Sequence, residues 1–469
     1  MAAMASRLFF AIALYAIAAC TQLVPKRGLE DVQKLFYEHE NKELVWTTTD
    51  ADRTSAKERA ADLLKEPLTG DRAVEIALLN SAALQADFEE LGIAQSQLIQ
   101  SGLPGNPTVG AEFKFRSHEP LKVELSIVQQ LLSVLYLPFR ARLGEEQFEV
   151  AKLRAALSAL ELAGEVREAF YAALRAALKR DLFQRSVAAQ EAAADLAERM
   201  YTAGNSTALQ RDTERILLNE TKLLLSEAEL NEVTTRESLN SLLGLWGEET
   251  NWTLETKIDG LPKSPTNGTD AEKLAVERSL NLKIAAKEQA IANAELRAAR
   301  PLSLFADGGV GGVAERDDGL WFGGPSIELP LPLFDQGRAA VFAAGSLARQ
   351  KEHLVRDLAV RIRASTRALY AASEAGRQRA RFIKQSVLPL KQSVTAETQK
   401  EYNAMLVGAF DLLRAKREEI ESGAGYIDAL YDYWTSRNDF EQLLSGRFVE
   451  AGLKNSESST RTRRTSEAH

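Results

Sequence analysis

Residues 121–127 read Leu-Lys-Val-Glu-Leu-Ser-Ile, in which apolar and polar side chains alternate without a fault. The run just before it alternates in the same way, with the apolar side chains Val109, Ala111, Phe113 and Phe115. Alternation with a period of two is typical of strands with one apolar and one polar face. The polar residues 116–120 separate the two runs, so the sequence predicts a β-hairpin.

A weaker copy of this pattern occurs in the second half of the chain. Its first strand is predicted from the alternating residues Leu302, Leu304 and Ala306. Its second strand is predicted from Pro325, Ile327 and Leu329. We expect the charged residues 314–319 to form a loop, and Trp321 and Phe322 to belong to an aromatic girdle at a membrane interface. The alternative for such a hairpin is a soluble, half-buried sheet.

Long helical runs follow each predicted hairpin. Residues 140–201 contain no proline, and their apolar residues recur every three or four positions, as in Val166, Phe170, Leu174 and Leu178. Similar runs cover residues 207–243, 339–402 (broken near Pro389) and 410–444. Periodic helices of this length predict coiled coils. Turns at Gly204-Asn205 and Val407-Gly408 would fold each pair of helices into an antiparallel hairpin.

The two halves of the chain therefore share one order of elements. Short segments support this: Ala77-Leu-Leu-Asn-Ser-Ala-Ala-Leu84 corresponds to Ala275-Val-Glu-Arg-Ser-Leu-Asn-Leu282. Likewise Tyr201-Thr-Ala-Gly204 corresponds to Tyr402-Asn-Ala-Met-Leu-Val-Gly408. A repeat this long predicts a duplicated half-domain and not a solenoid of short units. We expect one copy at residues 71–246 and the other at 271–446.

The N-terminus predicts export and anchoring. Residues 1–19 hold one cation and a short apolar run, as in a signal peptide. The run ends in Ile17-Ala-Ala-Cys20, which resembles the bacterial lipobox, so we expect Cys20 to be lipidated. Cys20 is the only cysteine, which excludes an internal disulfide. An ordinary secretory signal with an incidental cysteine is the alternative. The residue after Cys20 is Thr21, and not the aspartate that favours retention in the inner membrane. We therefore expect the protein in the outer membrane.

Composition narrows the class of protein. The net charge of −8 argues against nucleic-acid binding, which needs a concentrated basic face. Beyond the signal there is no apolar run of about eighteen residues, so any membrane crossing requires strands. Four strands do not close a barrel by themselves, so several protomers would have to share one.

The duplicated order, the segment Pro330-Leu-Pro-Leu-Phe-Asp-Gln-Gly337 and the two Tyr…Gly turns resemble the TolC-type outer membrane efflux protein family. The match covers residues 71–446. The resemblance implies an α+β membrane protein that forms a homotrimer. A twelve-stranded transmembrane β-barrel, with four strands from each protomer, would continue into a long α-helical coiled-coil barrel in the periplasm. Residues 20–70 and 247–270 would contribute to an equatorial region, and residues 447–469 are expected to be a disordered tail.

The function implied by the resemblance is a passive duct for substrates delivered by an inner-membrane pump and a periplasmic adaptor protein. The candidate pore-lining residues are Lys114, Lys122, Glu124, Ser126, Ser326 and Glu328. The candidates for the periplasmic tip, where the family meets its adaptor, are Tyr201, Gly204, Asn205, Tyr402, Met405 and Gly408. Asp212 and Asp411 are candidate gate residues, because three-fold symmetry would turn each into a carboxylate ring. The alternative is that both are solvated acids on a helix surface.

Residues 402–413 look most like members of the family associated with heavy metals or copper, so metal ions are one candidate cargo. No His/Cys/Glu cluster has the spacing of a metal site, and we expect no cofactor. We expect no enzyme, because Gly308-Gly-Val-Gly-Gly312 lacks the Lys-Ser/Thr of a phosphate loop and no other catalytic motif occurs. The competing hypothesis is a lipid-anchored coiled-coil structural or adhesion protein without a pore.

Overall fold

The computed structural model describes residues 26–115, 121–130, 134–256, 261, 268, 270–305, 308–317, 320–331 and 333–451. The predicted signal peptide, Cys20, the hairpin residues 116–120 and the chain beyond residue 451 lie outside the described residues. The described chain is mostly helical with one small antiparallel sheet, which confirms this part of the predicted fold class. None of the described helices is long and apolar enough to span a membrane.

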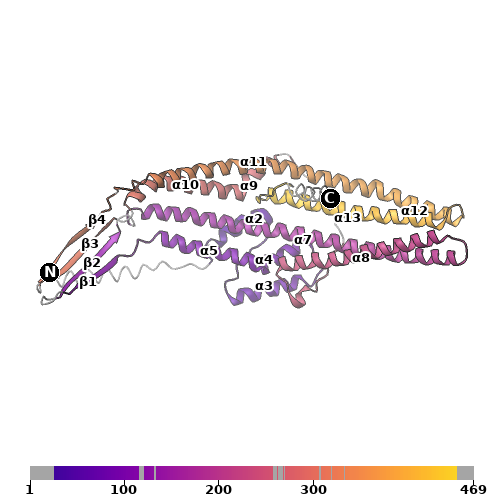
Figure 1. Ribbon diagram of the computed structural model, residues 1–469, viewed down its shortest axis with the longest axis horizontal. Helices are drawn as coiled ribbons and strands as arrows, with labels where there is room; N and C mark the ends of the chain where they lie inside the picture. The colour runs from indigo at the N-terminus through magenta and orange to yellow at the C-terminus, as the bar shows by residue number, and fades with distance from the viewer. Residues whose placement is uncertain are drawn as a thin grey trace, which may run out of the picture. The chain divides into compact units, whose positions relative to one another are not determined.

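Both halves of the chain contain short helices, two strands and long helices, in that order (Figure 1). The elements of the first half are α2 (Leu29–Glu40), α3 (Asp50–Leu63), α4 (Gly70–Asn80), α5 (Ala82–Ser101), β1 (Thr108–Lys114), β2 (Lys122–Gln130), α7 (Leu137–Thr202) and α8 (Ala208–Leu243). Those of the second half are η1 (Gly247–Thr250), α9 (Ala271–Arg278), α10 (Leu280–Phe305), β3 (Gly309–Asp317), β4 (Leu320–Glu328), α11 (Arg338–Phe382), η2 (Ile383–Val387), α12 (Leu388–Asn403) and α13 (Ala409–Leu444).

The described residues fall into two compact units. The first lies within residues 1–32, 87–155 and 282–357, and it contains the sheet. The second lies within residues 33–86, 156–281 and 358–469, and it contains both helical hairpin turns.

The long helices begin and end within a few residues of their predicted bounds. The predicted break near Pro389 is a π-helical turn, η2, after which Pro389 lies in the first turn of α12. Proline has no backbone N–H and its ring clashes with the carbonyl four residues earlier in a regular helix. A single π turn just before it relieves this conflict without ending the helix.

The sheet has the strand order β1-β2-β3-β4, and all three pairs are antiparallel. In the first hairpin Val109 lies opposite Ile127 and Phe113 lies opposite Val123. Residues directly opposite one another share a face, so the alternation of both strands brings their apolar side chains to the same side. The first predicted hairpin is therefore confirmed.

In the second hairpin only the first strand is displaced from its predicted position, because β4 contains Pro325 and Ile327 of the predicted second strand. Residues 302–305 continue helix α10, and β3 runs through Gly309–Asp317, including part of the predicted charged loop. The glycines hid this strand, because they are depleted in strands and carry no alternating pattern. Here they allow close approach of neighbouring strands: a Cβ on Gly311 would lie 2.0 Å from the carbonyl oxygen of Ile127.

The second unit contains a matching break in each half of the chain. The two predicted helical segments, residues 77–84 and 275–282, are each interrupted by a serine, Ser81 or Ser279. The backbone N–H of Ser81 donates to Ala77, and that of Ser279 donates to Ala275. Both serines then turn to extended ψ angles, so each segment becomes two consecutive helices instead of one.

The glycine after each long helical hairpin packs against one of these breaks. A Cβ on Gly244 would lie 2.7 Å from the carbonyl oxygen of Asn80, and one on Gly446 would lie 2.7 Å from that of Arg278. Both glycines have positive φ, at 67° and 100°. Glycine is thus required twice, for its left-handed backbone and for close approach.

The chain after α13 is packed for at least five more residues. The backbone N–H of Phe448 donates to Asn281 at 2.8 Å, and Arg361 binds the carboxylate of Glu450 at 2.9 Å. The predicted tail at residues 447–469 therefore begins too early in the sequence, because these polar contacts hold residues 447–451 against the second unit.

Candidate functional site

The structure brings the six predicted pore-lining residues onto one face of the sheet. In the first hairpin Lys114 lies opposite Lys122, and Glu124 and Ser126 follow on the same face at alternate positions of β2. Gly311 of β3 lies opposite Val128 of β2 on one side and opposite Ser326 of β4 on the other. Gly309 lies in the same way between Gln130 and Glu328, so Ser326 and Glu328 belong to the same face. Shared register, and not proximity in sequence, makes these six side chains a single surface.

Two acidic residues of this face were missing from the prediction. Glu112 lies opposite Glu124, which in turn lies opposite Glu315 of β3, so three carboxylates cross three strands in one row. Lys114 Nζ donates to Glu124 at 3.1 Å and lies 3.5 Å from Glu112, which offsets the repulsion in the first hairpin. The alternation already pointed to Glu112, whereas Glu315 was hidden by the loop predicted at 314–319.

In each hairpin a glycine lies opposite a serine on this polar face. Gly110 pairs with Ser126, and Gly311 pairs with Ser326. A Cβ on Gly110 would lie 2.5 Å from Ser126 Oγ, and one on Gly311 would lie 3.0 Å from Ser326 Oγ. The glycines therefore make room for two hydroxyl groups at matching places in the two hairpins.

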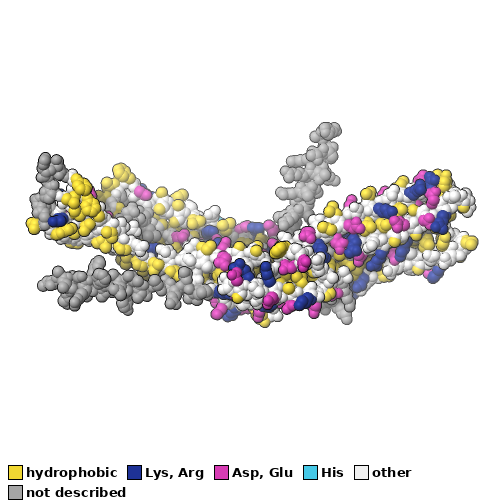
Figure 2. Space-filling model, turned by 90° about the horizontal axis from the view of Figure 1, so that it is seen from below, with side chains coloured by type: hydrophobic (Ala, Val, Ile, Leu, Met, Phe, Trp, Pro, Cys, Tyr) yellow, Lys and Arg dark blue, Asp and Glu magenta, His cyan; other side chains and the backbone are white. Residues whose placement is uncertain are grey.

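The opposite face of the sheet is mostly apolar, with the exposed Arg316 opposite Trp321 as an exception, and much of it is solvent-exposed in the part of the chain that the structure describes. Its exposed apolar side chains are Val109, Phe113, Leu125, Ile127, Val310, Trp321 and Ile327. Figure 2 shows hydrophobic side chains gathered over the strands. Trp321 lies on this face, but Phe322 lies opposite Glu315 on the polar face, so the register separates the two aromatic residues that we expected in one girdle.

The first helical turn contains the tip candidates Tyr201, Gly204 and Asn205. The Asn205 N–H donates to the carbonyl of Met200 at 2.8 Å, and Gly204 has a φ of 74°. This is the usual way to end a helix with a left-handed glycine. The side chain of Thr207 then caps α8 by accepting a hydrogen bond from the backbone N–H of Gln210. The guanidinium of Arg211 lies 4.3 Å from the ring of Tyr201.

The second helical turn has the same hydrogen bonds with different residues. The Leu406 N–H donates to Glu401 at 2.9 Å, and the N–H of Met405 donates to Tyr402. The left-handed residue is Met405, with a φ of 60°, and not Gly408. Gly408 has extended φ and ψ angles and caps α13. The structural counterpart of Gly204 is therefore Met405, which the sequence comparison had missed.

Both gate candidates form local ion pairs. Arg211 Nε donates to Asp212 at 2.8 Å, and this hydrogen bond lowers the pKa of Asp212 below its usual value. Asp411 accepts from the backbone of Gly408 at 3.3 Å and from Arg414 at 3.0 Å, so it stabilises the first turn of α13. A role for either residue in closing a channel stays a prediction.

A small polar cavity of about 240 Å³ lies close to the two turns, between α7, α8 and α13. Gln190 and Glu214 line it, with side chains 5% and 6% exposed. Gln190 Oε1, Glu214 Oε2 and Arg417 Nε are buried there without a hydrogen-bond partner among the described residues. Burial raises the pKa of Glu214, and the nearby positive charge of Arg417 opposes this only in part.

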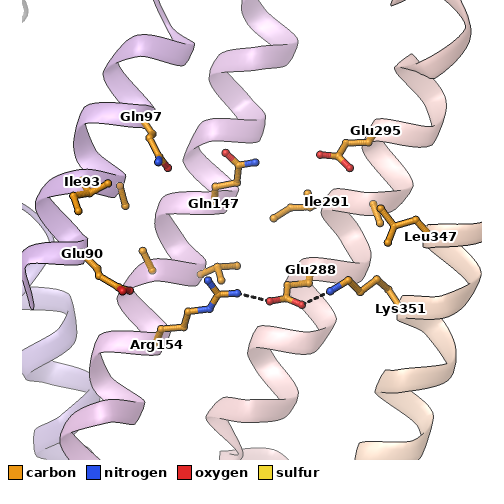
Figure 3. Close-up of a pocket in the computed structure, with 14 residues that line it drawn as sticks. Glu90, Ile93, Gln97, Gln147, Arg154, Glu288, Ile291, Glu295, Leu347 and Lys351 are labelled. Atoms are coloured by element: carbon orange, nitrogen blue, oxygen red, sulfur yellow. Dashed lines mark hydrogen bonds and ion pairs between the residues drawn. The ribbon is translucent and has the colours of Figure 1, made fainter. Parts of the chain in front are cut away.

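A larger cavity of about 490 Å³ lies in the first unit, among α5, α7, α10 and α11 (Figure 3). Glu288 of α10 accepts from Arg154 of α7 at 2.5 Å and from Lys351 of α11 at 2.7 Å. Partial burial opposes the ionisation of Glu288, but the two cations outweigh it and lower the pKa of this carboxyl. One carboxylate therefore holds three helices together.

Among the described residues, no group of three His, Cys, Asp or Glu side chains is placed to hold a metal ion.

Comparisons with known proteins point to one fold. No family model matches the chain, and no curated protein matches it by sequence. Solved structures do match. The Campylobacter jejuni CmeC outer membrane channel is 14% identical with a TM-score of 0.65, over 93% of this chain and 95% of that one. The open state of the Neisseria gonorrhoeae MtrE outer membrane channel is 16% identical with a TM-score of 0.65, over 82% and 89%.

CusC, a protein described as forming a transmembrane channel, is similar at 13% identity and a TM-score of 0.65, over 80% of this chain and 92% of that chain. At these identities the likeness shows the fold. The chain has the fold of these outer-membrane channels, which confirms at the level of fold the resemblance found in the sequence.

Proposed function

We propose that this protein is the outer-membrane duct of a tripartite efflux system, in which it passively exports substrates delivered by an inner-membrane pump and a periplasmic adaptor. One observation carries the proposal: a channel-type fold contains a sheet with one exposed, mostly apolar face and an opposite face that carries most of the charged and hydroxyl side chains. A sheet of this kind suits lipid on one side and water on the other.

The edges of the sheet support a homotrimer. Among the described residues β1 and β4 each have one strand neighbour, so each leaves an open edge. Open edges are not tolerated in lipid, because their backbone groups lack hydrogen-bond partners there. Three copies joined edge to edge would form a twelve-stranded barrel, with Lys114, Lys122, Glu124 and Ser126 facing its water-filled interior. Lipidation of Cys20 would anchor the same assembly in the outer membrane.

The helical turns are the proposed contact with the adaptor. Met405 and Leu406 are among the most exposed apolar side chains of the described chain. Exposed apolar residues at the end of a helical hairpin suit a protein partner better than water. Asp212 and Asp411, near the two turns, would form carboxylate rings in a trimer and act there on passing cations.

The narrower hypothesis of a metal cargo rests on the sequence of residues 402–413. A duct need not bind what passes through it, so the cargo depends on the pump and the adaptor. Deleting the gene and measuring growth with copper, other heavy metals and dyes tests this hypothesis. Sensitivity to dyes alone would contradict it while leaving the duct in place.

Conductance tests the duct itself. We expect the purified protein to form trimers and discrete channels in planar bilayers. Glu124→Lys on the polar face should raise the permeability of anions relative to cations. Glu58→Lys is the matched control, because Glu58 is exposed on α3, outside the sheet. A monomer that stays soluble after Cys20→Ser and shows no conductance would support the anchored coiled-coil protein instead.

A further inference from the structure

A third cavity lies in the first unit, between α7 and α10, and its volume is about 380 Å³. Apolar side chains form one wall of it, among them Phe139, Leu143 and Ile291. Arg142 of α7 and Arg297 of α10 also line it, and both arginines are exposed. The cavity therefore combines an apolar wall with two cations that come from different helices.

Neither guanidinium group has a carboxylate partner in the described part of the chain. Arg297 donates to the backbone carbonyl of Asn293 at 3.2 Å. Glu146, the acidic residue that lines this cavity, is already bound by Lys287 at 2.9 Å. The cavity therefore keeps a positive charge, and both arginines have further N–H donors for an anion.

The cation on α10 is not a consequence of the repeated fold. The helices α5 and α10 begin at the corresponding residues Ala82 and Leu280. Continuing this alignment along the two helices pairs Arg297 with Ile99, which is half-buried. The same position thus carries an apolar residue in one half of the chain and an exposed cation in the other, so the charge is a property of this cavity.

The lengths of the strands place the cavity relative to a membrane that covers the apolar face of the sheet. Strands β2, β3 and β4 have nine residues each, which corresponds to about 30 Å of extended chain. At the tilt of about 40° that is usual for membrane strands they rise about 23 Å, close to the apolar band of about 25 Å. The helices that adjoin the sheet therefore begin where the lipid headgroups begin.

Both arginines lie near the helix ends that adjoin the sheet. Arg142 follows the start of α7 at Leu137 by about 8 Å, and Arg297 precedes the end of α10 at Phe305 by about 12 Å. A headgroup layer is about 5–8 Å thick, and long arginine side chains extend toward it from below. Two cations are thus available at the depth of the lipid phosphates.

Exposed apolar residues connect the sheet to the helices that follow it. Leu135, after β2, is 62% exposed, and Leu333 and Phe334, after β4, are 72% and 100% exposed. Tyr136 then packs edge to face against Phe139, which lines the cavity. Apolar exposure therefore continues from the sheet to the cavity, as expected for a surface that acyl chains cover.

We propose that this cavity binds an anionic phospholipid, with the phosphate between Arg142 and Arg297 and one acyl chain along Phe139 and Leu143. Guanidinium groups bind phosphate oxygens through charge-assisted hydrogen bonds, often two from one group. A zwitterionic lipid carries its own cation, which competes with the arginines for the phosphate, so the site prefers a headgroup with net negative charge. The inference rests on the proposed duct, because that function puts the cavity at the depth of the headgroups.

Lipid binding by the purified full chain tests the site. In native mass spectrometry from detergent, phosphatidylglycerol should bind at concentrations at which phosphatidylethanolamine does not. Arg142→Gln and Arg297→Gln should each weaken the binding of phosphatidylglycerol about fivefold, and the double variant about twenty-fivefold. Arg185→Gln is the matched control and should bind like the wild type, because Arg185 is exposed on the same helix roughly twelve turns farther along.

The headgroup alone provides the second arm of the experiment. Glycerol phosphate carries the phosphate without acyl chains, so it should not displace phosphatidylglycerol from the protein. Displacement at similar concentrations would replace the lipid by a soluble phosphate ligand and overturn the proposal. Equal binding of phosphatidylglycerol and phosphatidylethanolamine, or unchanged binding by the double variant, would overturn the role of the two arginines.

The outcomes separate this site from the proposed duct. Wild-type protein that forms conducting channels but shows no preference for phosphatidylglycerol overturns the lipid site and leaves the duct intact. Wild-type protein that binds phosphatidylglycerol through the arginines but does not conduct overturns the duct, and the lipid site then belongs to a membrane-bound protein without a pore.

Discussion

The two helical hairpin turns use the same hydrogen bonds but place different residues in the strained position. In the first turn the left-handed residue is Gly204, for which positive φ carries no steric penalty. In the second it is Met405, whose Cβ makes this conformation unfavourable by roughly 1–2 kcal/mol. The side chain that causes the strain is 92% exposed, so packing within the chain does not repay it.

This difference separates a turn that only reverses the chain from one that presents a side chain. Strained backbone conformations cluster at binding and switch sites in many proteins. Met405 and its exposed neighbour Leu406 form an apolar end on the second hairpin, while Tyr201 of the first turn is partly covered by Arg211. If the proposed adaptor contacts one turn more than the other, the second is the better candidate.

The largest expected effect on stability is at the glycine that follows each helical hairpin, because both halves of the chain have a left-handed glycine there. Gly244→Ala and Gly446→Ala should each lower the free energy of unfolding by about 2–4 kcal/mol, from left-handed strain and from the clash with a fixed carbonyl oxygen. Urea unfolding in detergent, followed by circular dichroism, measures this change. A change below 0.5 kcal/mol in either variant (about one-quarter of the lower expectation) would contradict the equivalence of the two glycines.

A glycine inside a helix of the second hairpin provides the control. Gly425 lies within α13, and in the described part of the chain no atom would lie within 4 Å of a Cβ there. Gly425→Ala should therefore stabilise the protein by about 0.5–1 kcal/mol, because alanine loses less backbone freedom in a helix.

The next effect tests the strained turn directly. Gly204→Met would put into the first turn the residue that occupies the second. It should lower the free energy of unfolding by about 1–2 kcal/mol, the cost of a left-handed residue with a Cβ. No atom of the described residues lies within 4 Å of the new Cβ, so a larger loss of stability would mean that a contact is involved in addition to backbone strain.

The reverse substitution, in the second turn, should change the free energy of unfolding by a smaller amount and in the opposite direction. Met405→Gly should stabilise the protein by about 0.5–1 kcal/mol, since the relief of strain is partly offset by the greater freedom of glycine in the unfolded chain. If Met405 also contacts the adaptor, the same variant should bind it more weakly. Surface plasmon resonance with the purified adaptor measures this, and unchanged affinity would limit Met405 to a structural role.

The smallest effect concerns a difference between the hairpins just beyond the turns. Glu214 is buried on α8, whereas the corresponding position of α13 is the buried Ala415. Because burial raises the pKa of Glu214, the folded state holds its proton more tightly than the unfolded state. This residue therefore destabilises the protein as the pH rises above its usual pKa of about 4.3, and not below it.

Glu214→Gln should remove this pH dependence. The variant should be more stable than the wild type at pH 8, and the difference should shrink as the pH approaches 4. Glu220→Gln is the control, because Glu220 is exposed on the same helix. Parallel stability profiles for wild type and Glu214→Gln would mean that water solvates the carboxylate inside the cavity.

Local patterns predicted some elements better than others. The strands β1 and β2 and the four long helices follow from alternation and from helical periodicity, because each side chain reports its own face. The strand β3 does not, since its glycines are placed by their neighbours and not by their own preferences. The six candidate pore-lining residues were found from alternation alone, but Glu315 required the register between β2 and β3.

The amino-acid sequence by itself determined the class of fold, the order of the elements and the polarity of the strand faces. These properties depend on the spacing of side chains along one segment, which a single chain displays directly. Only the tertiary structure decided that Met405 is the counterpart of Gly204 and that Glu288 joins three helices. Each of these depends on which distant segments meet, and that is a property of packing and not of local pattern.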